Sequence, residues 1–161
     1  MSIVDKINEI IDNRMDKKTY DAEYELWLAG LHEAGHILKI LEAEKAGFAL
    51  FDEARIYGDE GEASYFTDDS VPMATELNTE IKVAGMVAVK TFYPTIEWYA
   101  GAELDTERAI ELAGQEGMKK SFRKTEREFK KRKSELLAVA MFLFAARTAY
   151  RDNVVRVLGV E

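Results

Sequence analysis

Apolar residues recur at helical spacing over most of the chain, which predicts a mainly helical protein. A short first helix is expected near the N-terminus. The next helix is expected to begin at Asp21, a favourable N-cap residue, and to stop at Gly47. The apolar positions of these two helices are Ile3, Ile7, Ile10, Ile11 and Met15, then Leu26, Leu28, Leu31, Ile37, Leu38 and Leu41.

One segment departs from the helical pattern. Strand-like stretches at 48–57 and 62–67 flank a turn at 58–61 that contains two glycines, so we expect a small β-hairpin there. Such a ribbon leaves a free edge, and an extended peptide can pair with that edge as an added strand.

Three further helices are expected. The first runs from about residue 74 to 93 and is broken by Pro94, the second begins near Glu103, and the last covers 134–158. No repeat or linker divides residues 1–161, so we expect a single domain. The predicted fold class is mainly α, a helical array with a small β-hairpin.

Composition narrows the chemistry that is available. The chain of 161 residues has a net charge of -8, which argues against nucleic-acid binding. It has no cysteine, so disulfides, thiolate metal sites and cysteine nucleophiles are excluded. No signal-peptide pattern is present, and the longest apolar run, 136–146, is too short for a bilayer. We therefore expect a cytoplasmic protein without a membrane span.

The two histidines of the chain are the strongest chemical signal. His32 and His36 lie four residues apart with Glu33 directly after the first, which is the HExxH pattern. On a helix this spacing places both imidazoles on one face, where they can hold one metal ion. Glu33 then stands beside the metal as a general base. By itself, the pattern also arises by coincidence among ordinary buried or surface histidines.

A catalytic zinc ion usually has three protein ligands and one open position. No third histidine and no cysteine exists in this chain, so the third ligand has to be a carboxylate. The sequence contains 30 acidic residues, and the spacing alone does not choose among them.

Two segments resemble the peptidase domain of the FtsH family, the zinc proteases of membrane-bound AAA+ machines. HEAGH at 32–36 is similar to that family's zinc motif, and GAELDTERA at 101–109 is similar to its GASNDIERA segment. The resemblance implies a Zn2+ site in which Asp105 is the third ligand, with Glu103 and Glu107 as the fallback ligands. Asp105 is alternatively an N-cap residue, since Thr-Glu-Arg follows it.

The chain also departs from the family. The family's AGRAAE segment, which lies between the two zinc motifs, continues here as AGMVAV at 84–89, without the arginine and the glutamate. Loss of outer groups weakens the orientation of metal ligands. No GxxxxGK[ST] phosphate loop is present, so we expect a freestanding peptidase domain without an ATPase.

The resemblance implies a zinc metalloendopeptidase that cleaves unfolded or flexible protein segments, with Glu33 as the catalytic residue. Tyr57, Tyr65 and Arg55 are open candidates for an oxyanion donor. One alternative is a regulatory or adaptor protein that keeps zinc but has lost useful proteolysis. Another is a zinc hydrolase that acts on a non-peptide amide.

A basic run between residues 119 and 133 has two interpretations. It is either a solvated helical face or a docking site for an acidic partner. The family resemblance also leaves room for a separate ATPase partner and for a homo-oligomer. The run comprises Lys119, Lys120, Arg123, Lys124, Arg127, Lys130, Lys131, Arg132 and Lys133.

Trp27 and Trp98 are both expected in the core.

Overall fold

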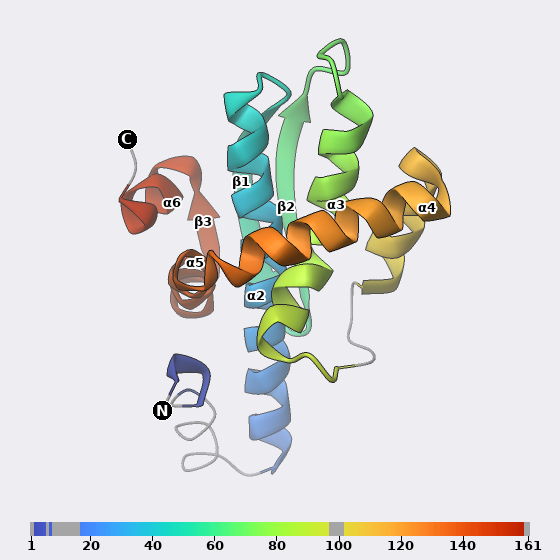
Figure 1. Ribbon diagram of the computed structural model, residues 1–161. Coiled ribbons are helices and arrows are strands. Elements are labelled where there is room, and N and C mark those ends of the chain that lie inside the picture. The colour runs from blue at the N-terminus through green and yellow to red at the C-terminus, as the bar shows by residue number, and fades with distance from the viewer. Residues whose placement is uncertain (1, 6, 8–16, 97–101, 160–161) are drawn as a thin grey trace.

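The computed structural model of the protein describes residues 2–5, 7, 17–96 and 102–159, with side chains described from residue 22 onward in the second of these stretches (Figure 1). It is mainly helical with one small antiparallel sheet, which confirms the mainly α class. The first predicted helix is helical at residues 3–5 and 7, and its remainder falls outside the described residues, as does Trp98.

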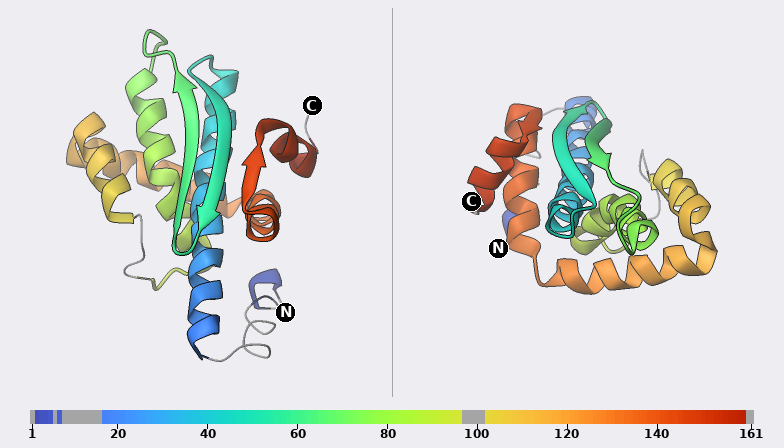
Figure 2. Two further views of the ribbon diagram at one scale, coloured as in Figure 1. Left: turned by 180° about the vertical axis from the view of Figure 1, so that it is seen from behind. Right: turned by 90° about the horizontal axis from the view of Figure 1, so that it is seen from above.

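The central element is helix α2 (Lys17–Lys45), which lies against the sheet, α3 and α5 (Figures 1 and 2). Every residue from Trp27 to Ile40 on it is buried, as expected for a helix with neighbours on all sides. The helix ends as predicted, since Gly47 adopts a left-handed φ of 76°. The predicted start at Asp21 is wrong, because the helix begins four residues earlier.

The sheet packs on α2 and contains one strand more than predicted. Strands β1 (Ala49–Tyr57) and β2 (Glu60–Thr67) form the expected hairpin, and β3 (Thr148–Tyr150) pairs with the other side of β1. Phe51, Ala54 and Ile56 of β1 are buried, and a register shift between Phe51 and Glu53 interrupts the strict alternation of the strand. The order β2-β1-β3 leaves β2 at an edge of the sheet.

The third strand corrects the prediction of one continuous helix over 134–158. The chain instead forms α5 (Lys133–Ala146), β3 and α6 (Arg151–Leu158). Arg147 ends α5 with a left-handed φ of 70°, and its carbonyl accepts a hydrogen bond of 2.9 Å from the Ile56 amide. On the side of β1 that faces away from β2, backbone N–H and C=O groups need hydrogen-bond partners. Pairing with residues 148–150 satisfies them, and this gain outweighs the local helix propensity of these residues.

Helices α3 (Ala74–Phe92) and α4 (Ala102–Lys130) complete the fold close to their predicted positions. Helix α4 is kinked at Gly114, whose φ of 74° and ψ of 170° are not helical. Beyond the kink it passes across α3 toward α5 (Figure 2). Most of the basic run lies on this second part and is exposed, as a solvated face should be.

A buried lysine ties α2, α3 and α4 together. The ammonium of Lys39 lies 3.0 Å from Glu80 on α3 and 2.7 Å from Glu128 on α4. Glu80 is also buried and has a second partner, Lys124, at 2.9 Å. Because a buried charge is tolerated only when it is paired, these contacts fix how the three helices meet.

Among the described helices, none is both long and apolar enough to cross a bilayer.

Helices α2 and α3 cross at Gly35, which has no room for a side chain. A Cβ there would lie 2.2 Å from the Ala84 carbonyl oxygen and 2.7 Å from the Ala88 Cβ. The backbone atoms of the two helices can approach this closely only because glycine lacks that atom.

Gly35→Ala is expected to lower the free energy of unfolding by about 2 kcal/mol through overpacking. This outcome is expected even though alanine gains ~1 kcal/mol over glycine in helix propensity. The measurement is urea unfolding followed by circular dichroism. Gly30→Ala is the control on the same helix, since its nearest atom would be 3.3 Å away, and it should be much milder. Equal or greater stability of Gly35→Ala would contradict the close crossing.

Candidate metal centre

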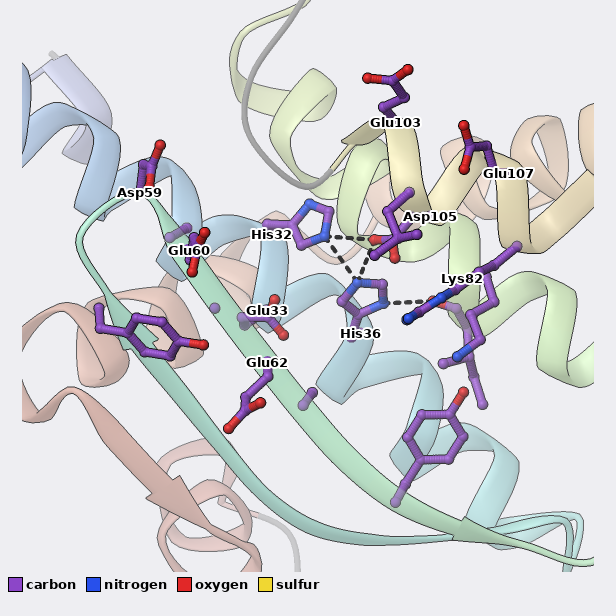
Figure 3. Close-up of a pocket in the computed structure, with 18 residues that line it drawn as sticks. His32, Glu33, His36, Asp59, Glu60, Glu62, Lys82, Glu103, Asp105 and Glu107 are labelled. Carbon is purple, nitrogen blue, oxygen red and sulfur yellow. Dashed lines mark hydrogen bonds and ion pairs between the residues drawn. The ribbon is translucent and has the colours of Figure 1, made fainter.

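Three side chains from two helices converge beneath the hairpin (Figure 3). His32 and His36 come from the middle of α2, and Asp105 comes from the first turn of α4. Oδ2 of Asp105 lies 2.7 Å from Nε2 of His32 and 2.9 Å from Nε2 of His36, while the two nitrogens are 3.0 Å apart. All three residues are buried. They form the one group among the described residues that could hold a metal ion.

The orientation of His36 is set by a backbone group on α3. Its Nδ1 donates a hydrogen bond of 2.6 Å to the carbonyl of Ile81. In the neutral imidazole, Nε2 therefore carries a lone pair, and that lone pair faces the carboxylate of Asp105. Two acceptors at this distance repel one another unless a proton or a metal ion lies between them.

The charges of the group reflect this arrangement. Burial opposes a charged imidazolium, yet the hydrogen bond and the charge of Asp105 together raise the pKa of His36 to about 9. Burial alone would raise the pKa of Asp105, but the hydrogen bonds from His32 and His36 hold that pKa well below its usual range. Without a metal ion, the carboxylate is therefore matched by a proton on His36.

The donor set suits zinc. It offers two imidazole nitrogens and one carboxylate oxygen and leaves a fourth position open toward a pocket, as in catalytic zinc sites. Tetrahedral zinc, with bonds of ~2.0–2.1 Å, keeps its ligand atoms roughly 3.3 Å apart. The three donor atoms would therefore have to separate by about 0.3 to 0.6 Å to hold zinc.

Gly85 on α3 makes room for the ring of His32. A Cβ at this position would lie 2.5 to 2.7 Å from three atoms of the imidazole. Packing against His32 thus requires a glycine at position 85. The next residue, Met86, accepts a hydrogen bond of 3.0 Å at its sulfur from Thr106, the neighbour of Asp105.

Glu33 is buried beside the donor group, with 3% of its surface exposed. Burial raises the pKa of Glu33 above its usual value, although the neighbouring histidines oppose the shift. Its Oε2 atom is buried and has no hydrogen-bond partner. The opposite wall is Gly61 on β2, where a Cβ would lie 2.7 Å from Cγ of Glu33. A buried carboxylate oxygen without a hydrogen-bond partner is energetically costly, and such atoms are typical of ligand-binding sites.

The acidic residues of the 101–109 segment occupy different positions relative to the donor group. Asp105 is the fourth residue of α4 and lies inside the helix, so the N-cap interpretation is wrong. Glu103 and Glu107 are exposed and lie outside the donor group (Figure 3). Gly101 falls outside the described residues.

A pocket of about 580 Å³ opens above the donor group, between the hairpin and α4. Of the candidate oxyanion donors, Tyr57 and Tyr65 line it, whereas Arg55 does not and instead pairs with Glu53 at 3.0 Å. Sequence reasoning gave no role to Lys82, which no local pattern marks, or to Arg108, although Arg108 lies in the 101–109 segment. The lining residues are Ala29, His32, Glu33, His36, Tyr57, Asp59, Glu60, Gly61, Glu62, Ala63, Tyr65, Ile81, Lys82, Glu103, Leu104, Asp105, Glu107 and Arg108.

The sequence matches no protein-family model and no curated protein. The functional interpretation therefore rests on the residues of the site and on their geometry.

Asp105→Asn is expected to weaken zinc binding by more than ~100-fold, the upper range for loss of an outer-shell group. The neutral amide removes the charge that the two histidines face. Competition with a chromogenic zinc chelator measures the affinity. Glu111→Gln makes the same change on the same helix, six residues away and outside the pocket, and should bind zinc like the wild type. Unchanged affinity of Asp105→Asn would move the third ligand elsewhere.

Proposed function

We propose that the protein is a zinc-dependent endopeptidase that cleaves unfolded or flexible protein segments. The observation that carries the proposal is the buried Oε2 atom of Glu33, which has no hydrogen-bond partner and belongs to a residue beside the buried group of His32, His36 and Asp105. We also propose that the domain is related to the FtsH peptidase domain. The proposal includes a cytoplasmic location, in keeping with a chain that has no cysteine.

His32, His36 and Asp105 would hold the zinc ion. A zinc ion bound there would act as a Lewis acid that polarises the substrate carbonyl and lowers the pKa of a water molecule. Glu33 performs the proton transfers, since its carboxylate accepts a proton from the attacking water and delivers it to the leaving amine. Its raised pKa suits this double role, because a group with a pKa nearer to neutrality both takes and returns a proton.

Two pocket residues are the proposed hydrogen-bond donors to the carbonyl oxygen of the substrate. Tyr57 and Arg108 both line the pocket and carry hydrogen-bond donors. Tyr65 is less suited, because its hydroxyl already donates a hydrogen bond of 2.9 Å to Asn78. A donor that points at the developing oxyanion lowers the barrier in acyl transfer.

The hairpin supports a mode of substrate binding. Strand β2 pairs with β1 on one side only, and its residues Gly61 and Ala63 line the pocket. An extended peptide could add to this edge and pass over the donor group. Folded domains cannot present such a strand, which is why flexible segments are the proposed substrates. A separate ATPase that unfolds proteins would widen the range of substrates, and a homo-oligomer is compatible with the site.

One observation favours a second candidate, a regulatory protein that binds zinc without useful proteolysis. Met86 and Val89 stand where the family pattern has charged residues. A protein that binds zinc tightly but cleaves neither flexible proteins nor peptides would fit this candidate. A hydrolase of non-peptide amides would instead cleave small amides and spare peptides.

Glu33→Gln is expected to lower kcat for a flexible substrate such as casein by about 10²- to 10⁴-fold, the range for general acid–base catalysis. Zinc affinity should stay close to that of the wild type, because Glu33 is not one of the three donors. Digestion assays and zinc content together separate these effects. The exposed Glu111→Gln, on α4 outside the pocket, serves as the control and should cleave normally. If Glu33→Gln cleaves like the wild type, the assigned general base is wrong.

A further inference from the structure

The pocket has acidic walls on both sides of the donor group. Asp59, Glu60 and Glu62 belong to the hairpin, while Glu103 and Glu107 belong to α4, and Figure 3 shows the donor group between the two sets. We call this pocket with its five carboxylates the acidic cleft. All five residues are exposed, and none forms an ion pair with another described residue.

The cations in the acidic cleft do not balance these charges. Lys82 and Arg108 are the two basic residues that line it. The ammonium of Lys82 lies 5.2 Å from the centre of the Tyr65 ring, at the side of the cleft that this tyrosine forms. A cleft lined by one sign of charge between low-dielectric walls concentrates ligands of the opposite sign. The acidic cleft therefore attracts cations.

The five carboxylates of these walls do not converge on a single metal ion. The group formed by His32, His36 and Asp105 is the one set of described residues whose donor atoms converge closely enough for that. The five carboxylates are instead spread along two walls. This arrangement complements a chain with several positive charges spaced along it, and the same walls repel nucleic acid.

Two further observations point to a ligand in the acidic cleft. Oε2 of Glu33 is buried without a partner and lies in the lining of the cleft. Tyr57 and Leu104 also line it and remain about half exposed, at 51% and 50%. Lysine and arginine side chains combine an apolar stem with a charged end, so they can cover such surfaces while their charges reach the carboxylates.

We propose that the acidic cleft selects extended peptide segments that carry lysine or arginine residues on either side of the stretch lying over the donor group. This inference rests on the proposed peptidase function and names its substrate class. The hairpin carboxylates contact the basic residues on one side, and Glu103 and Glu107 contact those on the other.

The test uses binding, so that it does not depend on catalysis. The probes are a short fluorescein-labelled peptide with lysines spaced along it and a twin with glutamine in their places. Fluorescence anisotropy with the zinc-loaded Glu33→Gln protein gives both Kd values. We expect the lysine peptide to bind roughly tenfold more tightly at low salt, with the preference shrinking as salt screens the charges.

The double variant Glu103→Gln/Glu107→Gln should reduce this preference about threefold or more, since each exposed charge pair contributes modestly. Glu111→Gln/Glu116→Gln is the matched control, because it removes the same charge from α4 outside the acidic cleft and should keep the preference. Equal Kd values for the two peptides would overturn the inference, and so would a Glu103/Glu107 variant that behaves like its control.

Wild-type digestion of the same two peptides separates this inference from the proposed function. Cleavage of both at equal kcat/KM, with equal Kd values, removes the charge selectivity and leaves the peptidase proposal standing. A tenfold binding preference without any cleavage supports the acidic cleft as a site for basic segments and counts against the peptidase.

Discussion

The contact of Asp105 with two histidines is the interaction on which the site depends. His32 and Asp105 lie 73 positions apart in the chain, yet one carboxylate oxygen is within 2.9 Å of both imidazoles. A buried carboxylate is stable only with compensating positive charge, which a proton on the histidines or a metal ion provides. The packing of α4 against α3 and α2 is therefore linked to the chemistry of three side chains.

Helix α3 provides the backing that makes this contact possible. It gives the Ile81 carbonyl that orients His36, and it gives the Gly85 surface against which His32 lies. Glu80, the residue before Ile81, holds Lys39 in a buried ion pair, so the same stretch fixes the spacing between α2 and α3. Metal ligands held in this way need little rearrangement on binding, which favours affinity. The close crossing at Gly35 completes this support.

Much of the arrangement could be predicted from the sequence, because local patterns encode it. The four-residue spacing of His32 and His36 places them on one face of a helix, and Gly47 marks the end of that helix. The resemblance, and not a physical argument, predicts Asp105 as a ligand. In the structure, Asp105 contacts both histidines. The remaining features depend on tertiary packing. No local pattern shows that Gly61 will cover Glu33, or that residues 148–150 will leave a helical run to pair with β1.

The most direct test of the zinc site is anomalous X-ray diffraction at the zinc absorption edge, from crystals of the protein grown with zinc. One strong peak is expected at bonding distance from Nε2 of His32, Nε2 of His36 and a carboxylate oxygen of Asp105, at about 2.0–2.2 Å. Bound zinc elsewhere on the protein, with no peak among these three residues, would contradict the proposed zinc site.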